Sequence, residues 1–277
     1  MRRDIRTFLS LRVAGYLAYI LPTVRTVKNW SSLLSDYVGI TNKGRVYTLR
    51  NGLKIETKDG ISSGTIVVVF VKKDYGEAPP PNSTVIDIGA NIGVYSLYAT
   101  QSQGTRVYAF EPMPQNFTLL KKNIEQNNLA FRIFPFQLAI SGRRETRTLY
   151  LGTSPMHSFL PISQSPFNAR FSSKENQPAQ ESAQVSCIPL QDVFDENRIM
   201  KCDLLKLDCE GAEYDILYNL PGAYFQRIQR IRMEYHNHLD KKENTGDALE
   251  AFLRGKGFQL EKRKRGSLHQ GDIWLKR

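Results

Sequence analysis

The sequence predicts an α/β fold built on a doubly wound, mostly parallel sheet. From Thr84 onward, short apolar runs alternate with segments of helical periodicity, which is the pattern of successive strand–helix–strand units. The first run ends in a turn that carries Gly89 and Gly93 before a helix begins, as ligand-binding crossovers often do. A length of 277 residues suffices for one large domain or two small ones.

The N-terminal part predicts helices and a hairpin rather than this alternation. Residues 1–35 read as helical, and two alternating runs around Asn51-Gly52 predict a hairpin over 45–60. The apolar run 65–71 fits either a strand or a buried helix, because periodicity alone does not separate the two.

A cluster of glycine, proline and asparagine at 76–83 breaks the chain into two predicted parts. We expect 1–80 to be a helical and hairpin extension that contacts a substrate or a membrane surface. We expect 81–277 to be the ligand-binding domain.

The alternation within the second part sets the expected elements. The expected strands are 84–89, 106–112, 131–141, 145–152, 203–208 and 227–236. The expected helices are 91–102, 114–128, one that starts near Gly211, and 244–254. Residues 153–183 are rich in Ser, Pro, Gln and Asn and predict a long loop that could act as a lid. Residues 257–277 predict a terminal antiparallel hairpin.

Composition excludes global disorder and locates the charge. Hydrophobic residues make up 41% and charged residues 23%, and the net charge is +11. Residues 1–60 hold 11 Lys and Arg against 4 Asp and Glu, and residues 254–277 hold 8 against 2. The two basic ends suggest an anionic partner, such as nucleic acid, acidic lipid or a phosphorylated substrate, although a merely solvated surface would look the same.

The ends and the cysteines bear on the compartment. The apolar stretch from Phe8 to Leu21 is interrupted by Arg12 and is short of the roughly 20 residues of a spanning helix. It predicts a helix packed on the protein, with contact with an anionic membrane surface as the alternative. Three cysteines without a C-x-x-C pair indicate neither a disulfide framework nor a zinc site, so a reducing cytoplasm fits best.

The turn after the first strand has the chemistry of a nucleoside site. Gly89, Asn91 and Gly93 follow Asp87, and glycines here let the backbone approach a ligand at the start of a helix. Glu111 ends the next strand, at the spacing where an acid accepts hydrogen bonds from ribose hydroxyls.

Two cofactors use such an arrangement. A dinucleotide places its pyrophosphate on this turn, and the carboxylate of Asp87 would repel it. S-adenosylmethionine carries a sulfonium and an ammonium and no phosphate, so an acid suits it better. Asp87 could instead cap the glycine turn, and both roles could hold together.

Four stretches now carry a family resemblance. The runs "VIDIGANIGVYSL", "VYAFEPMPQNFTLLKKNI", "DLLKLDCEGAEYDIL" and "RMEYH" resemble, in order and character, the FkbM family of methyltransferases. The resemblance implies a class I, Rossmann-like S-adenosylmethionine-dependent methyltransferase domain, with a seven-stranded sheet and an antiparallel last strand. It also implies O-methylation of hydroxyls on sugars, glycolipids or polyketide macrocycles.

The same resemblance assigns the cofactor residues. Asp87, Gly89, Asn91 and Gly93 would form the methionine-side loop. Glu111 would hold the ribose, Pro112 would shape its turn, and Ala139 and Ile140, at the end of the third strand, would lie near adenine. Asn91 stands where many methyltransferases have a second glycine, a mild departure.

Acids and a histidine end the later strands. Asp208 ends the fourth strand, Glu234 and His236 end the fifth, and Glu210 follows closely, so these side chains should meet at the carboxyl edge of the sheet. An alcohol is a weak acid and needs a general base. We expect His236 or Glu210 to take the proton while Asp208 positions the cofactor ammonium or the acceptor hydroxyl.

A magnesium site is the alternative use of these groups. Asp208, Glu210, Glu234, His236 and His238 offer oxygen and nitrogen ligands, and a Mg²⁺ ion can lower the pKa of an acceptor. This alternative is not the favoured one.

Three residues near these acids have structural explanations. We expect Glu213 to be an acid in the first turn of a helix, and His238 to be a surface residue. Cys209 lies between acids, which raise the pKa of a thiol, so we expect it to be a packing residue.

His157 and Ser158 lie at the start of the expected loop and resemble a recurrent family feature. The resemblance implies that they contact the substrate, together with Glu234.

Two other functions compete with methyl transfer to a hydroxyl. The basic tract 261–266 would suit a nucleic-acid-binding or RNA-modifying protein, but no aromatic stacking motif accompanies it, so nucleic acid is not the expected partner. An inactive scaffold that kept the fold is the other. The oligomeric state has no signature in the sequence.

Overall fold

The computed structural model describes residues 18–151, 158–159, 182–238, 243–266 and 270–277. The expected loop 153–183 therefore lies almost wholly outside the described residues. So does the first half of the expected helix 1–35, and its contact with a membrane stays a prediction.

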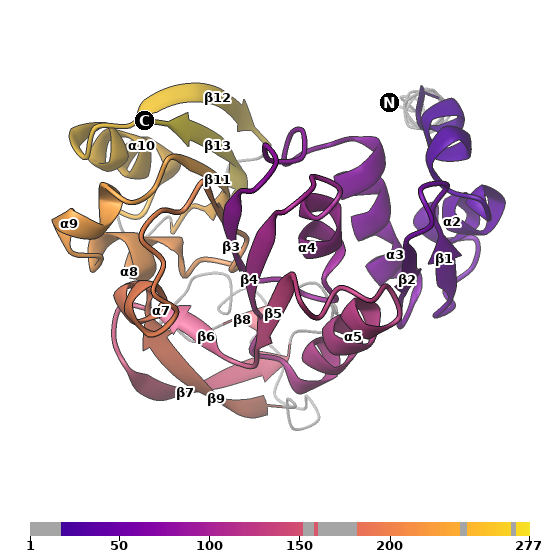
Figure 1. Cartoon of the computed structure of the whole chain (residues 1–277), viewed down its shortest axis with the longest axis horizontal. Helices are drawn as coiled ribbons and strands as arrows, with labels where there is room; N and C mark the ends of the chain where they lie inside the picture. Colours follow the sequence, from indigo (N-terminus) through magenta and orange to yellow (C-terminus); the bar gives the residue numbers. More distant parts are fainter. Residues whose placement is uncertain (1–17, 152–157, 160–181, 239–242, 267–269) are drawn as a thin grey trace, which may run out of the picture.

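The centre of the fold is one seven-stranded sheet, ordered β12-β13-β11-β10-β3-β4-β5 (Figure 1). Only β13 runs antiparallel to its neighbours. This confirms the doubly wound, mostly parallel sheet with an antiparallel last strand. The strands are β3 (Thr84–Ile88), β4 (Arg106–Phe110), β5 (Ile133–Phe136), β10 (Leu204–Leu207), β11 (Arg230–His236), β12 (Gln259–Arg265) and β13 (Gln270–Lys276).

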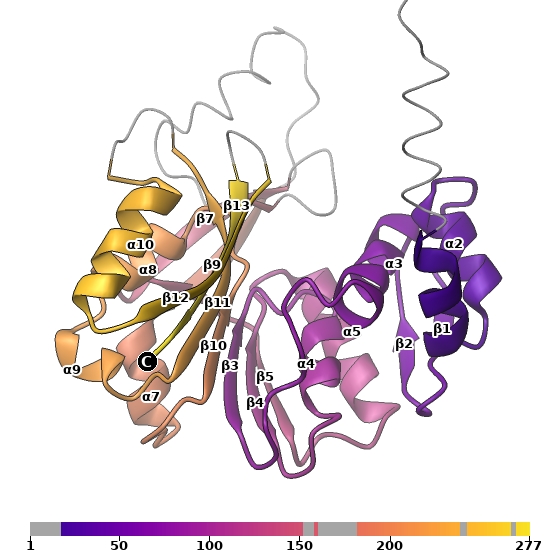
Figure 2. The ribbon, with the colours of Figure 1, turned by 90° about the horizontal axis from the view of Figure 1, so that it is seen from above.

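Helices cover both faces of this sheet (Figure 2). On one face lie α4 (Val94–Ala99) and α5 (Pro114–Glu125). On the other lie α7 (Leu190–Glu196), α8 (Glu213–Tyr218), α9 (Gly222–Phe225) and α10 (Gly246–Gly255).

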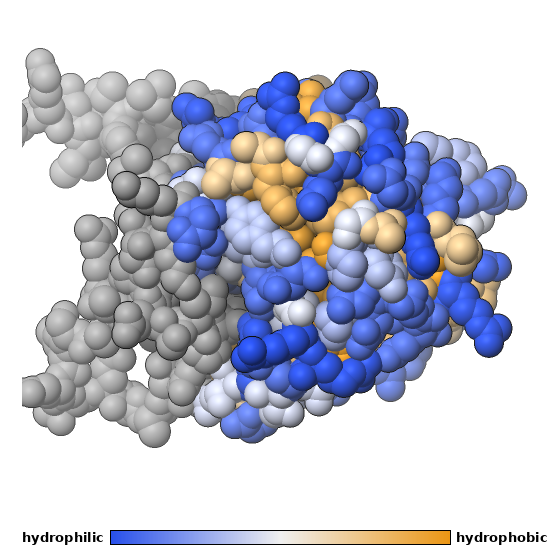
Figure 3. All heavy atoms as spheres, turned by 90° about the vertical axis from the view of Figure 1, so that its left-hand side faces the viewer, coloured by the Kyte–Doolittle hydropathy of each residue, from blue (hydrophilic) through white to orange (hydrophobic). Residues whose placement is uncertain are grey.

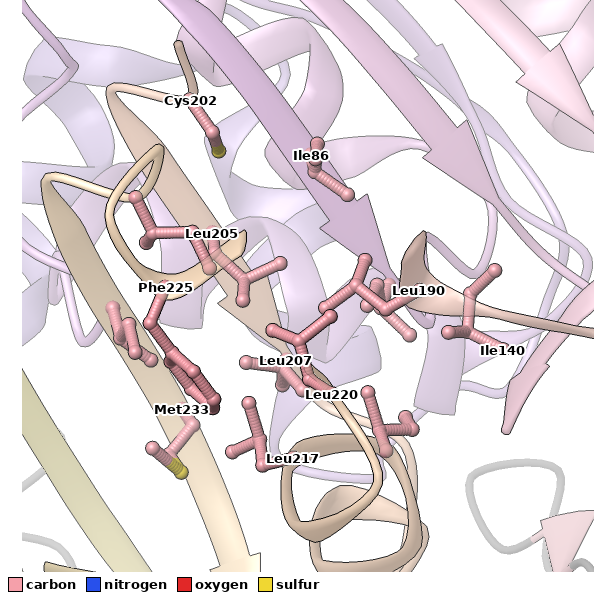
Figure 4. Packing of buried hydrophobic residues seen from close by; sticks show 14 of the residues in the cluster. Ile86, Ile140, Leu190, Cys202, Leu205, Leu207, Leu217, Leu220, Phe225 and Met233 are labelled. Atoms are coloured by element: carbon pink, nitrogen blue, oxygen red, sulfur yellow. The ribbon is translucent and has the colours of Figure 1, made fainter. Parts of the chain in front are cut away.

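The alternation of side chains along each strand divides the core into two clusters. Ile86 and Leu205 pack with the helices on the α7–α10 side, whereas Val85 packs with α4 and α5 on the other. Figure 4 shows Leu207, Met233 and their neighbours meeting side chains of the covering helices. Both faces of the central strands are buried, which is why their sequences are apolar runs.

The N-terminal extension packs on the sheet domain as a continuous structure. Residues 18–26 and α2 (Trp30–Tyr37) are helical, and β1 (Val46–Thr48) pairs with β2 (Lys54–Glu56) in the predicted hairpin. The ambiguous run 65–71 is helical, divided between α3 (Gly60–Ile66) and the π-helix η1 (Val67–Val71). Leu33 and Ile55 share a core cluster with Val85 and Leu97 of the domain.

The prediction of a single strand over 131–141 is wrong. Residues 131–141 form two short strands, and the second, β6 (Ala139–Ser141), joins a separate four-stranded sheet. There it pairs in parallel with β9 (Ser182–Pro189), next to β7 (Glu145–Leu151) and β8 (Ser158–Phe159). The apolar pattern indicated extended chain correctly, but β6 pairs with residues of β9 that lie 48 positions later in the chain, and this pairing takes it out of the main sheet.

The C-terminal hairpin forms one edge of the main sheet. Six of the seven residues of β12 are exposed, among them Lys262 and Arg265, and charged side chains on an edge strand discourage pairing with another chain. Figure 3 shows the face at the left of Figure 1, where α9 and α10 lie, as mainly hydrophilic around an apolar strip. None of the helices in the described part of the chain combines the length and the hydrophobicity needed to cross a bilayer.

Candidate active site

A cavity of about 790 Å³ opens at the carboxyl ends of the central strands. The turns and strand ends that follow β3, β4, β10 and β11 form one side of it, and the N-terminal extension forms the other. Predicted site residues on its wall are Gly89, Asn91, Glu111, Pro112, Ala139, Ile140, Asp208, Glu210, Glu234 and His236.

The turn after β3 needs glycine for steric reasons. Gly89 has a φ of +73°, and a Cβ atom there would lie 1.8 Å from the carbonyl oxygen of Asp208. Gly93, with a φ of +88°, is the N-cap of α4. Glycine at residue 89 therefore lets the turn after β3 pack directly against the backbone at the end of β10, where any side chain would collide with it.

Glu111 is fixed at the end of β4. Its Oε2 accepts from the backbone N–H of Asn91 and its Oε1 from that of Met113, both at 2.9 Å. Burial raises the pKa of Glu111, and these hydrogen bonds oppose the rise. A carboxylate has about four acceptor positions, so it can still accept from hydroxyls in the cavity.

Ala139 and Ile140 line the cavity together with Leu138. These side chains form an apolar surface of the kind against which a flat aromatic ring packs. Their expected place in the sheet needs correction. They begin β6, whereas the third strand of the main sheet, β5, ends at Phe136.

Asp87 does not reach the cavity wall. Its side chain is fully buried, where it accepts a 2.7 Å hydrogen bond from Ser96 and lies 3.1 Å from Nζ of Lys206. The carboxylate is therefore already paired with a cation, and it cannot present an uncompensated charge to a ligand. Gly93 also lies outside the residues that line the cavity.

Lys206 is a site residue that sequence reasoning missed. Its Nζ donates to the carbonyl of Gly89 at 2.9 Å and lies 3.7 Å from Oδ2 of Asp208. Burial lowers the pKa of Lys206, but the charges of Asp87 and Asp208 raise it by more, and the net shift is upward. The signal was present, because a lysine within an apolar strand needs a buried partner.

Tyr75 is the second residue that was missed. It comes from the extension, yet its hydroxyl donates a 2.7 Å hydrogen bond to Oδ2 of Asp208. Nothing in the local pattern around Tyr75 indicates a contact with a strand end more than a hundred residues away.

His236 is the centre of a cluster of acids. Its Nδ1 lies 3.1 Å from Oε1 of Glu213, and its Nε2 lies 3.4 Å from Glu210 and 3.9 Å from Glu234. Burial lowers the pKa of His236, but the hydrogen bond to Glu213 and the charges of all three acids outweigh it and raise the pKa to about 10. The ring is an imidazolium at neutral pH, in which both nitrogens are donors.

Glu213 was expected to serve only as a helix-start acid. It is the first residue of α8, as predicted, but its side chain is fully buried and is the hydrogen-bond partner of His236. Glu213 has this second role because the fold brings the first residue of α8 within 3.1 Å of the ring of His236, at the end of β11.

Glu234 shares the cluster. Burial first, and then the charge of Asp208, raises the pKa of Glu234 to about 8. Gln270 donates a 2.9 Å hydrogen bond to it.

His238 is buried and Cys209 is partly buried next to this cluster. The prediction that His238 lies on the surface is wrong, since the residue is 8% exposed and packs edge-on against Tyr214. For Cys209, burial and then the charges of Glu213 and Asp208 raise the pKa well above the usual range, as expected for a thiol that packs between acids. Cys187, Cys202 and Cys209 are all free thiols.

His157 and Ser158, two of the expected substrate residues, stay predictions. His157 lies outside the described residues, and of Ser158 only the backbone is described, in β8. Within the described ranges, no group of three or more His, Cys, Asp or Glu side chains is arranged to hold a metal ion. The magnesium alternative stays a prediction.

Comparison with known proteins gives a match to one family. The model of the methyltransferase FkbM domain matches residues 87–260. The 31-O-demethyl-FK506 methyltransferase FkbM of Streptomyces tacrolimicus is 30% identical over 198 residues, which cover 65% of this chain and 74% of the relative. The hexuronic acid methyltransferase AglP of Haloferax volcanii is 26% identical over 167 residues, which cover 60% of this chain and 62% of the relative.

Other matches involve larger proteins. The AMB antimetabolite synthetase AmbE of Pseudomonas aeruginosa is 28% identical over 231 residues, 74% of this chain but only 11% of AmbE. Among solved structures, the methyltransferase FkbM of Methylobacillus flagellatus KT has a TM-score of 0.46 at 15% identity, over 78% of this chain and 54% of that one.

Proposed function

Because this chain belongs to the FkbM family of methyltransferases, we propose that it transfers the methyl group of S-adenosylmethionine to a hydroxyl oxygen. The acceptor that we propose is a sugar, a glycolipid or a polyketide-type molecule. Two relatives support this choice by name, one acting on demethyl-FK506 and one on hexuronic acid.

One observation carries the proposal. The glycine turn and Glu111 line the same cavity as Glu210, Glu234 and His236, so the proposed nucleoside site and the proposed proton acceptor would share one continuous space. Methyl transfer to a hydroxyl needs this combination, since the acceptor must be aligned and its proton removed.

The described residues fit S-adenosylmethionine in kind. Gly89 brings backbone to the cavity wall, Glu111 offers a carboxylate to ribose hydroxyls, and Ala139 and Ile140 offer an apolar surface to adenine. When bound, the cofactor supplies an activated methyl group. Because Asp87 is paired with Lys206, the carboxylates that would face a cationic ligand are those on the cavity wall, Asp208 and Glu210.

Of the two candidate bases, we favour Glu210. The imidazolium of His236 has no free acceptor position while its pKa stays near 10. Glu210 lies 3.4 Å from Nε2 of His236, so the ring can orient the carboxylate and stabilise it. The proton of the acceptor hydroxyl would then pass to Glu210.

Incubation with labelled S-adenosylmethionine tests the proposal. The protein would be mixed with separate extracts of glycans, lipids and RNA, and we expect alkali-stable label in a hydroxyl-bearing glycan or lipid. Label that enters only RNA would support the RNA-modifying alternative instead. The Glu210→Gln variant is the matched control for transfer by this site.

A further inference from the structure

Tyr75 joins the N-terminal extension to a carboxylate of the site. Its ring is 8% exposed and its hydroxyl donates to Oδ2 of Asp208 at 2.7 Å. Both residues line the cavity. Tyr75 precedes residue 87, where the family match begins, so membership of the family assigns it no role.

The main sheet fixes the backbone of this tyrosine. The guanidinium of Arg232, on β11, donates to the carbonyl oxygens of Tyr75 and Glu77 and lies 5.1 Å from the ring of Trp274. The Tyr75 ring packs edge-on against Tyr95, with 5.4 Å between centroids. Backbone and ring are therefore both anchored, which holds the hydroxyl within hydrogen-bond distance of Asp208.

Asp208 lies between two donors. Its Oδ2 accepts from Tyr75 and also lies 3.7 Å from Nζ of Lys206, which is already paired with Asp87. Burial, and then the charge of Asp208, raises the pKa of Tyr75 well above its usual range. The hydroxyl is therefore protonated and a donor at neutral pH.

We infer that Tyr75 is a positioning residue of the cofactor site, which holds Asp208 so that its carboxylate faces the sulfonium charge of bound S-adenosylmethionine. Without the hydroxyl, Asp208 can turn toward Lys206, and a closer pair there would cancel the negative charge that the cofactor meets. This inference rests on the proposed function. It makes the extension a necessary part of the cofactor site.

The test compares two ligands that differ in the sulfonium charge and share the ammonium. Calorimetry would measure the affinity of the Tyr75→Phe variant for S-adenosylmethionine and for S-adenosylhomocysteine, which lacks the sulfonium charge. We expect about tenfold weaker binding of the first, the scale of one hydrogen bond to a charged group, and a change of under about threefold for the second. Retained binding of S-adenosylhomocysteine also shows that the variant is folded.

Tyr98→Phe is the matched control. The Tyr98 hydroxyl donates to the carbonyl of Gly76 at 3.0 Å, in the same segment, without contacting Asp208. We expect both affinities of this variant to stay within about twofold of the wild type. A double-mutant cycle adds Asp208→Asn, in which Tyr75→Phe should have little further effect.

Three results would overturn the inference: unchanged affinity of Tyr75→Phe for S-adenosylmethionine, an equal loss for both ligands, or a full additional loss in the Asp208→Asn background. Failure of the wild-type protein to bind S-adenosylmethionine is a separate result. It would overturn the proposed function and the inference with it.

Discussion

Nδ1 of His236 lies 3.1 Å from Oε1 of Glu213, a carboxylate with no exposed surface. The pair joins the end of β11 to the first residue of α8, and it leaves Nε2 of the ring near Glu210 at the cavity. A buried acid that orients an imidazole is a common way to fix which nitrogen faces a reacting group. The contact ties the protonation state of the site to the packing of α8.

Replacing the buried acid should change the titration of the histidine. In Glu213→Gln we expect the pKa of His236 to fall from about 10 toward its ordinary 6.5, because the hydrogen bond to a charged partner is lost. NMR titration of the ring protons measures this directly. The His238→Gln variant removes the other histidine that ends this strand and serves to assign the signal.

The same pair should make stability depend on pH. A histidine whose pKa is raised in the folded state stabilises that state. The stabilisation is complete below pH 6.5, the pKa of histidine in the unfolded chain, and is lost as the pH rises through about 10, the pKa in the folded protein. Urea unfolding should show a free energy of unfolding that falls over this range in the wild type. In Glu213→Gln the fall should be smaller by about 2 kcal/mol, the scale of one charged hydrogen bond. Identical slopes in the two proteins would count against the pairing.

The proposed base gives an activity prediction. Glu210→Gln keeps the shape and loses the acceptor charge, so we expect the transfer rate to fall by roughly 10²-fold or more while affinity for S-adenosylmethionine changes little. Single-turnover transfer with labelled cofactor measures the rate. Glu261→Gln, on the exposed hairpin, is the control and should keep full activity. A full rate in Glu210→Gln would exclude this carboxylate as the base.

The glycine turn gives a stability prediction. Gly89→Ala would place a Cβ atom 1.8 Å from the Asp208 carbonyl at a φ of +73°, so the turn must open. We expect a loss of about 2 kcal/mol or more, together with loss of cofactor binding. Gly255→Ala is the matched control, because nothing lies within 4 Å of its Cβ position. Thermal unfolding of both variants measures the difference, and equal midpoints would show that the turn tolerates a side chain.

The buried pair of Lys206 and Asp87 predicts non-additive mutations. Lys206→Met leaves the carboxylate buried without its cation, and we expect it to cost about 3–5 kcal/mol of unfolding free energy. Adding Asp87→Asn removes that charge and should restore part of the loss, since the asparagine oxygen can still accept from Ser96. Denaturant unfolding of the single and double variants completes the cycle. Simple additivity would mean that the two charges do not depend on each other.

The elements of the sheet were predictable because they are local. The apolar runs at Val85–Ile88 and Leu204–Leu207, each followed by acids or glycines, predict both the strands and the edge at which the cavity opens. The spacing between Asp87 and Glu111 predicts that an acid follows the second strand at this edge, and Glu111 does line the cavity. Each of these signals lies within one strand–helix–strand unit.

The contacts within the site were less predictable because they are not local. Tyr75 and Asp208 are 133 positions apart in the chain. Glu213 and His236 are 23 positions apart, and helices α8 and α9 occupy much of the chain between them. The position of Asp87 in the sequence is that of an acid that faces a ligand. In the structure its carboxylate is paired instead with Lys206 on the adjacent strand. The path of β6 out of the main sheet depends in the same way on a partner strand far along the chain.

The central claim is that the cavity at the carboxyl ends of the strands binds S-adenosylmethionine. Calorimetric titration of the full chain tests it most directly, with Glu111→Gln as the variant that weakens the ribose contact. We expect saturable binding at one site per chain in the wild type, and affinity about tenfold weaker in Glu111→Gln. Absence of binding heat in the wild type across several temperatures, or equal binding by the two proteins, would contradict the claim.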